Sequence, residues 1–80
     1  MKPVQMKMAR AALGWSVREL AERAGVTANT ISRIETGSDA KGSTLSAIQR
    51  ALEDGGVQFI PENGGGAGVR FARTRELGKS

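Results

Sequence analysis

The sequence contains neither cysteine nor histidine. Without thiols the chain can form no disulfide and offers no thiolate ligand to zinc. Without imidazole it lacks the most common general base and metal ligand. Its carboxylates fall mostly on expected helix surfaces, without the spacing of a metal site or a nucleophile-base pair. We therefore predict a protein that is not an enzyme and that binds no metal or other cofactor.

Aromatic residues are also scarce, with one Trp, two Phe and no Tyr among 80 residues. The core must therefore consist of Leu, Ile, Val, Met and Ala, and a thin core of this kind favours dimerisation in a small domain. No segment resembles a signal peptide, and no apolar run approaches the roughly 20 residues that cross a bilayer. We therefore expect a cytoplasmic protein without a membrane partner.

Positive charge is the clearest bias of composition, with a net charge of +4 and an isoelectric point near 10.4. A basic protein suits a polyanionic partner such as nucleic acid, although net charge alone is weak support. The choice of partner therefore depends on the motifs.

Two short helices that meet at a glycine turn are the clearest local pattern. Ser16 and Glu19 have the spacing of a capping box, so the first helix is predicted to begin at Ser16. Gly25 ends it, because a left-handed residue after the last turn suits glycine. Thr27 is a natural N-cap for the second helix, which stops at Gly37. Two amphipathic helices joined by so short a turn are typical of a helix-turn-helix unit.

This segment resembles the lambda-repressor/Cro-like family of bacterial regulators, also called the XRE family. The matching residues are Ser16, Glu19, Leu20, Ala21, Ala24, Gly25, Val26, Thr27, Thr30, Ile31, Ile34, Glu35 and Gly37. The resemblance extends from about Met6 to Leu52. It implies a DNA-binding domain in which the second helix of the unit lies in the major groove.

Helical spacing of apolar residues continues on both sides of the unit, over residues 4–13 and 44–54. We predict a mainly α fold, a four-helix lambda-repressor-like DNA-binding domain over residues 1–55 with a C-terminal β-hairpin. The predicted core consists of Met6, Ala9, Leu13, Val17, Leu20, Val26, Ile31, Ile34, Leu45, Ile48 and Leu52.

The hairpin is predicted within residues 56–72. Segments 57–60 and 69–72 alternate apolar and polar residues on either side of a glycine-rich break. A lone hairpin is marginal and leaves bare edges, so it must pack on the helices or join another chain. We favour a dimer sheet with helix 44–54 behind it. Its predicted interface residues are Val57, Phe59, Val69 and Phe71. Residues 73–80 are predicted to form a flexible basic tail.

Two further residues have predicted structural roles. Arg10 lies near the inward side of the first helix. The family resemblance implies that it pairs with Glu35 and so joins the first helix to the end of the third; two unrelated surface charges are the alternative. Trp15 is interpreted as a hydrophobic lid on the next helix rather than a platform for stacking bases.

The face that reads DNA is predicted on the helix over residues 27–36. With Ile31 and Ile34 turned inward, one outward stripe is left for base edges. This stripe comprises Ala28, Asn29, Ser32 and Arg33. An Asn side chain binds adenine with two hydrogen bonds, an Arg binds guanine or phosphate, and an Ala contacts a thymine methyl group.

Contacts to the DNA backbone are expected where helices begin, because amides at these positive ends attract phosphate. The predicted residues are Ser16, Val17, Arg18, Thr27, Thr30, Lys41, Ser43 and Thr44. For the polar side chains among them the alternative is capping alone. Arg18 and Arg23 are alternatively solvated partners of Glu22 and its neighbours.

Taken together, these patterns predict a sequence-specific transcriptional regulator bound to double-stranded DNA and located at the nucleoid. Such units read half-sites about one helical turn apart, so a homodimer on an inverted repeat is expected. An antitoxin that represses its own promoter, with a toxin as partner, is a close alternative. A protein-interaction module that keeps the fold without binding DNA is another, but the predicted reading stripe is compatible with DNA.

Overall fold

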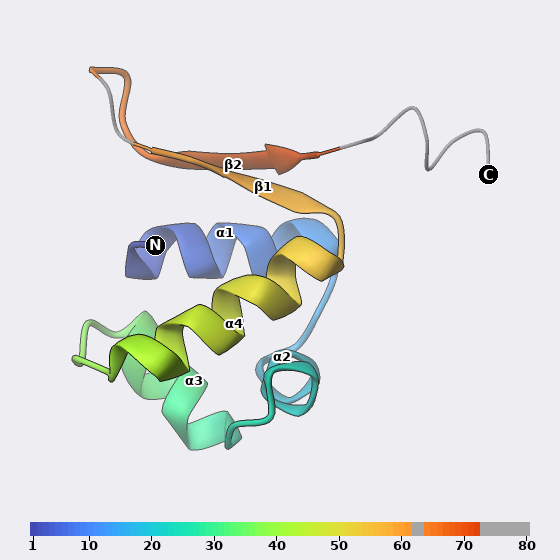
Figure 1. Ribbon diagram of the computed structural model, residues 1–80, viewed down its shortest axis with the longest axis vertical. Coiled ribbons are helices and arrows are strands. Elements are labelled where there is room, and N and C mark those ends of the chain that lie inside the picture. The colour runs from blue at the N-terminus through green and yellow to red at the C-terminus, as the bar shows by residue number, and fades with distance from the viewer. Residues whose placement is uncertain (62–63, 73–80) are drawn as a thin grey trace, which may run out of the picture.

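The computed structural model describes residues 1–61 and 64–72. Within this part of the chain, four helices are followed by an antiparallel hairpin (Figure 1). The elements are α1 (Pro3–Leu13), α2 (Val17–Ala24), α3 (Ala28–Glu35), α4 (Gly42–Asp54), β1 (Val57–Ile60) and β2 (Gly68–Phe71). The predicted mainly α fold with a C-terminal hairpin is confirmed. The predicted tail, residues 73–80, lies outside the described residues.

Glycines end the first two helices, and the one after the second helix, Gly25, was predicted. Gly14 and Gly25 have φ angles of 71° and 75°, in the left-handed region. Their amides donate to carbonyls of the last turn of α1 and α2. A residue with a Cβ is strained in this conformation, which explains why the sequence uses glycine at both ends.

The start of α2 differs slightly from the prediction. Ser16 is the N-cap, with its Oγ accepting from the Glu19 amide at 3.0 Å, so the helix begins one residue later at Val17. The Glu19 carboxylate accepts from Arg23 Nε at 2.7 Å, one helical turn along, instead of reaching back to complete a capping box. Half of the predicted box is therefore present.

The last helix also begins earlier than the predicted 44–54. The Leu45 amide donates to the Lys41 carbonyl at 3.0 Å, so the first turn already includes Gly42 and Ser43. Lys41 is the N-cap by its extended backbone and makes no side-chain cap bond. Glycine and serine are poor helix formers, so nothing in the local sequence marks this start.

One hydrophobic core joins the helices and the hairpin. Its buried members are Met6, Ala9, Leu20, Ala21, Ile31, Ile34, Ile48, Ala51, Leu52 and Val57. The predicted core residues Leu13, Val17, Val26 and Leu45 are only partly buried and pack against its rim. Val57 was missed because the prediction closed the core with helices alone. In the structure its side chain is 2% exposed at the start of β1.

The hairpin lies across α1 and α4 (Figure 1). Val57 pairs with Phe71 and Phe59 pairs with Val69, so these four side chains share one face, as predicted. The second strand begins at Gly68 rather than at residue 69, because Gly68 pairs with Ile60.

A buried glutamine fastens the hairpin to α1. Gln5 is 4% exposed, and its Nε2 donates to the carbonyls of Ile60 and Gly68, at 3.1 Å each. Its Oε1 accepts from the Lys2 amide at 2.8 Å. Buried polar groups need such partners, and here they come from both strands. The hairpin is therefore held by hydrogen bonds as well as by apolar packing.

Trp15 closes the end of α4. Its ring is partly buried against the core, and the Arg23 guanidinium carbon lies 4.3 Å from the ring centroid. The ring also packs against Gly55. A Cβ added at Gly55 would come within 2.6 Å of Trp15 Cη2 and 2.9 Å of Leu13 Cδ1. Trp15 is therefore a lid, as interpreted, but it covers the C-terminal end of α4 as well, which was not predicted.

The contact between Trp15 and Gly55 gives a stability prediction. Gly55 has right-handed backbone angles, so Gly55→Ala should be harmless to the backbone but should force the indole to shift. We expect a loss of about 1–3 kcal/mol in the free energy of unfolding, measured by urea titration. Gly42→Ala is the matched control, because its Cβ would meet nothing within 4 Å. A Gly55→Ala protein as stable as the control would contradict the contact.

Candidate nucleic-acid interface

The third helix has one buried side and one exposed side. Ile31 and Ile34 are 0% and 4% exposed and anchor it in the core. The opposite side carries the four predicted base-reading residues, Ala28, Asn29, Ser32 and Arg33, and all four are exposed. The structure therefore brings these residues together on an open stripe of α3.

An ion pair fixes the far end of α3. Arg10 Nε and Nη2 donate to the two carboxylate oxygens of Glu35 at 2.8 and 3.1 Å. The Arg10 Nη1 also donates to the Trp15 carbonyl at 3.0 Å. The two side chains are only 20% and 7% exposed. A bidentate, largely buried contact of this kind fixes the direction of α3 relative to α1.

Beside the stripe, α3 and the start of α4 border a shallow hollow of about 290 Å³. It is lined by one predicted base-reading residue, Arg33, and by three predicted backbone contacts, Thr30, Lys41 and Thr44. Arg33 and Lys41 are exposed and have no ion-pair partner among residues 1–61 and 64–72. Sequence reasoning missed Asp39, which also lines the hollow and adds a negative charge beside these cations.

The start of α2 supplies a second set of predicted backbone contacts. Ser16 is exposed, and its Oγ acts as acceptor in the cap, which leaves its hydroxyl proton free to donate. Val17 is partly buried. Arg18 is exposed and makes no ion pair within the described part of the chain, whereas Arg23 pairs with Glu19. The two arginines therefore differ: Arg18 makes no ion pair among the described residues, whereas Arg23 would have to leave its exposed pair with Glu19 to bind a phosphate.

The cap at the start of α3 occupies the two threonines. Thr27 Oγ1 accepts from the Thr30 amide at 3.2 Å, and the two hydroxyl oxygens lie 2.9 Å apart. One of these hydroxyls donates to the other, so only one hydroxyl proton remains for a phosphate. Capping is thus the first role of this pair.

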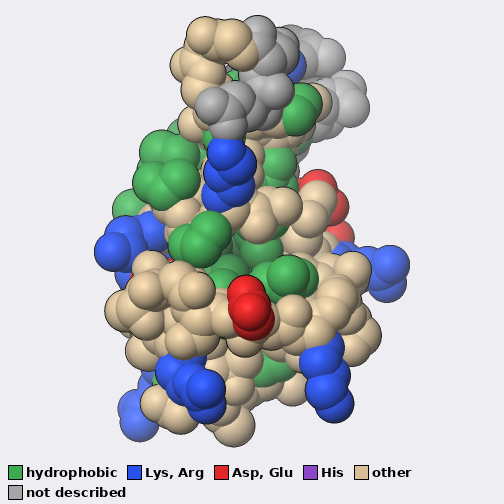
Figure 2. All heavy atoms as spheres, turned by 90° about the vertical axis from the view of Figure 1, so that its left-hand side faces the viewer, with side chains coloured by type: hydrophobic (Ala, Val, Ile, Leu, Met, Phe, Trp, Pro, Cys, Tyr) green, Lys and Arg blue, Asp and Glu red, His purple; other side chains and the backbone are tan. Residues whose placement is uncertain are grey.

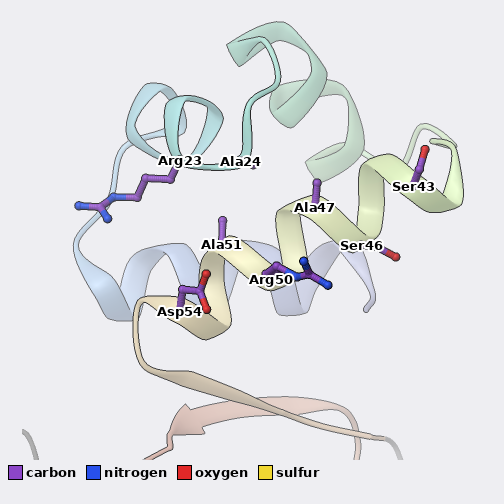
Figure 3. A pocket seen from close by; sticks show the side chains of 8 residues that line it. All are labelled: Arg23, Ala24, Ser43, Ser46, Ala47, Arg50, Ala51 and Asp54. Atoms are coloured by element: carbon purple, nitrogen blue, oxygen red, sulfur yellow. The ribbon is translucent and has the colours of Figure 1, made fainter.

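Ser43, by contrast, lies outside the hollow. It lines a groove of about 420 Å³ between α2 and α4 (Figure 3). The Ala47 and Ala51 methyl groups point from α4 toward α2 (Figure 3), and Arg23, Arg50 and the acidic Asp54 also line the groove. Arg50 was not singled out from the sequence, because its position on an outward face of α4 gave no motif.

Basic side chains are spread over the surface, the α3 end included. On the face seen in Figure 2, Lys and Arg side chains lie at both lower corners, at both sides and near the top, and acidic side chains lie at the centre and at the right edge. The net charge of +4 suits a polyanion, and its attraction extends over about 10 Å at 0.1 M salt.

A comparison with protein families matches residues 6–53, more than half of the chain, to the helix-turn-helix family HTH_3. The chain belongs to the Cro/C1-type helix-turn-helix family. It therefore carries the DNA-binding domain of a transcription regulator, as the sequence resemblance implied. A comparison with curated proteins found no match. No helix in residues 1–61 and 64–72 is both long and apolar enough to cross a membrane.

The hairpin of this helix-turn-helix protein lies beyond the matched residues. Its four predicted interface side chains differ in exposure. Val57 is 2% exposed, Phe59 and Val69 are partly buried against this chain's own core, and Phe71 is 43% exposed. Of the four, only Phe71 is exposed.

Proposed function

We propose that the protein is a sequence-specific transcriptional regulator that reads the DNA major groove with α3, as a homodimer on an inverted repeat. The observation that carries the proposal is the exposed stripe of Ala28, Asn29, Ser32 and Arg33 on a helix whose other side is anchored in the core. Nothing of this chain covers the stripe among the described residues.

Each member of the stripe has chemistry suited to base edges. The Asn29 amide offers one donor and one acceptor side, which fits adenine, and the Arg33 guanidinium fits guanine. Arg33 has no ion-pair partner in the described part of the chain, so no contact has to be broken before it binds. Ser32 accepts or donates, and Ala28 offers a methyl contact.

Phosphates on either side of the groove would hold the protein in register. We assign this role to the predicted residues at the starts of α2, α3 and α4: Ser16, Val17, Arg18, Thr27, Thr30, Lys41, Ser43 and Thr44. Such contacts orient a protein on DNA but carry no sequence information themselves.

A single α3 reaches only a few base pairs, so two copies are needed for useful specificity. We assign DNA binding to residues 1–55 and dimerisation to residues 56–72. A two-fold dimer reads two identical half-sites, and these form an inverted repeat. An antitoxin that represses its own promoter would use the same surface of α3, and only a toxin partner would distinguish it.

Selection of binding sites from a random duplex library, at two salt concentrations, tests this function. The expected result is an inverted repeat with half-sites about one helical turn apart. Binding without any enriched sequence, and with strong salt dependence, would show that only the general positive charge binds DNA.

Replacing Arg33 by Ala is expected to weaken binding to the selected site by about 1–3 kcal/mol and to relax the preference at one base position. Asn29→Ala should do the same at another position. Both side chains are exposed, so the free energy of unfolding should change little. Affinities by fluorescence anisotropy and a repeated selection measure the two effects.

Lys41→Ala is the matched control for Arg33→Ala. It removes one positive charge from the same hollow, at the start of a different helix. We expect it to weaken all sequences alike and to reduce the salt dependence by about one unit. If the Arg33→Ala protein selected the same motif as the wild type, the assignment of Arg33 as a base-reading residue would be wrong.

A further inference from the structure

The loop between α3 and α4 brings one carboxylate into the basic hollow. At the end of α3, the Gly37 amide donates to the Ile34 carbonyl at 2.9 Å. The Ser38 amide donates to the Arg33 carbonyl, also at 2.9 Å. With the positive φ of 106° at Gly37, these two bonds make a Schellman motif. Asp39 follows this motif directly, so the end of α3 determines where Asp39 lies.

The start of α4 fixes the loop from the other side. The Lys41 carbonyl accepts from the Leu45 amide at 3.0 Å, and Ala40 packs partly buried against the core. Between these two anchors Asp39 is exposed, and it lines the hollow together with Arg33 and Lys41. It is the only acidic residue among the described residues that line this hollow.

The Asp39 carboxylate has no bonded partner to neutralise it. It makes no ion pair or hydrogen bond within residues 1–61 and 64–72, and neither do the side chains of Arg33 and Lys41. Glu19 and Glu35, by contrast, each bind an arginine. Because a carboxylate near the positive start of a helix is favourable, stabilisation of α4 is the alternative role for Asp39.

A phosphate that entered the hollow would meet charges of both signs. Arg33, Lys41 and the amides at the start of α4 would attract it, and the Asp39 carboxylate would repel it. The hollow of about 290 Å³ is narrower than the screening length of about 10 Å at 0.1 M salt. The carboxylate therefore acts on a phosphate anywhere inside the hollow.

This repulsion matters most on DNA of the wrong sequence. An arginine binds either a guanine edge or a phosphate, and Arg33 cannot bind both at once. Without a matching guanine, binding depends almost entirely on phosphate contacts, and Arg33 and Lys41 would draw a phosphate between them. With a matching guanine, Arg33 is occupied at the base edge.

We propose that Asp39 is a specificity residue that acts by repulsion: its carboxylate keeps a phosphate from settling between Arg33 and Lys41, and so weakens binding to unrelated DNA more than binding to the selected site. The inference rests on the proposed function and deepens it, since it adds a residue that rejects wrong sequences. Specificity is a difference between two affinities, and an unfavourable contact to the wrong partner increases this difference.

Asp39→Asn tests the repulsion, because it removes the charge and keeps the size of the side chain. Fluorescence anisotropy at 0.1 M salt compares the selected duplex with a duplex of the same length and random sequence. We expect the variant to bind the random duplex about fivefold more tightly, and the selected duplex less than about twofold more tightly. The ratio of the two affinities should therefore fall by at least about twofold.

Asp54→Asn is the matched control for the loss of one negative charge. Asp54 ends the 13-residue α4, roughly 20 Å along the helix from Lys41 and beyond the screening length. Both affinities should stay unchanged. Asp39→Glu keeps the charge and should keep the wild-type ratio. Circular dichroism checks that each variant remains folded, and a purely structural role at the start of α4 would alter stability without altering the ratio.

Combining Asp39→Asn with Arg33→Ala separates this mechanism from a general effect of net charge. Without Arg33, no phosphate is drawn across the hollow, so removing the carboxylate should strengthen binding to the random duplex by less than about twofold. A fivefold gain with or without Arg33 would overturn the proposal, because Asp39 would then act without reference to Arg33.

The remaining outcomes separate Asp39 from the proposed function. An Asp39→Asn protein that binds both duplexes as the wild type does, or both equally more tightly, would overturn the role of Asp39 and leave the regulator intact. A wild type that selects no sequence would refute the regulator. The random duplex would still decide whether Asp39 opposes phosphate, since a fivefold gain that depends on Arg33 supports this repulsion and an unchanged affinity overturns it.

Discussion

Replacing Glu35 by Ala is expected to lower the free energy of unfolding by about 3–5 kcal/mol. The change leaves the Arg10 guanidinium, whose side chain is 20% exposed, with only the Trp15 carbonyl as partner. A buried charge without its counter-charge is costly, and small domains have only about 5–15 kcal/mol in total. The melting temperature should therefore fall by more than about 10 °C. Urea titration followed by the fluorescence of the single Trp measures the loss.

Two further variants separate burial from charge in this experiment. The exposed pair of Glu19 and Arg23 is the control, with side chains 41% and 52% exposed, so Glu19→Ala should cost less than about 1 kcal/mol. Arg10→Met combined with Glu35→Leu removes both charges and should be more stable than Glu35→Ala alone. If Glu35→Ala lowered the free energy of unfolding no more than Glu19→Ala does, the Arg10–Glu35 pair would stabilise the fold no more than an exposed ion pair.

Replacing Ile31 by Ala is expected to cost about 2–5 kcal/mol, because it leaves a cavity where a completely buried side chain anchors α3. Ile31→Ala should weaken DNA binding only because less of the protein is folded. The protein that remains folded should select the same bases. Thermal unfolding by circular dichroism and the selected motif are the two measurements.

Ser32→Ala is the matched change on the other side of the same helix. Ser32 is exposed, so its loss should alter stability by less than about 0.5 kcal/mol. It should instead weaken binding to the selected site. If Ile31→Ala altered the motif and Ser32→Ala did not, the assignment of buried and reading sides to α3 would be reversed.

Sequence reasoning succeeded where the determining interactions are local. The glycines after α1 and α2 and the caps at Ser16 and Thr27 depend on neighbours within one helical turn. The alternation in the hairpin likewise gave the shared face of Val57 and Phe71. In each case, backbone conformation follows from residue type within a few positions.

Sequence reasoning failed where the role of a residue depends on segments distant in the chain. Gln5 reads as an ordinary helix surface residue until the hairpin supplies carbonyls 55 and 63 residues away. The early start of α4 depends on packing, and Gly42 gives no local signal for it.

The candidate site likewise has one part that the sequence predicted and two parts that only the structure shows. The stripe on α3 followed from helical periodicity and from the family resemblance, since Ile31 and Ile34 determine which side is left exposed. The hollow beside it required the structure, because Arg33 and Lys41 come from different helices and Asp39 belongs to a loop. The groove that holds Ser43 and Arg50 was hidden for the same reason, since it forms only where α2 and α4 pack together.

The hydrogen bonds of Gln5 also impose an order on biosynthesis. The ribosome releases α1 first, but the partners of its buried amide, Ile60 and Gly68, are made nearly last among the described residues. Until then the Gln5 amide must stay in water, and the surface that Val57 later covers is open. Contacts so distant in sequence slow folding. The nascent chain therefore acquires its complete native packing only after residue 68 has emerged, although the helix-turn-helix segment has been available since residue 37.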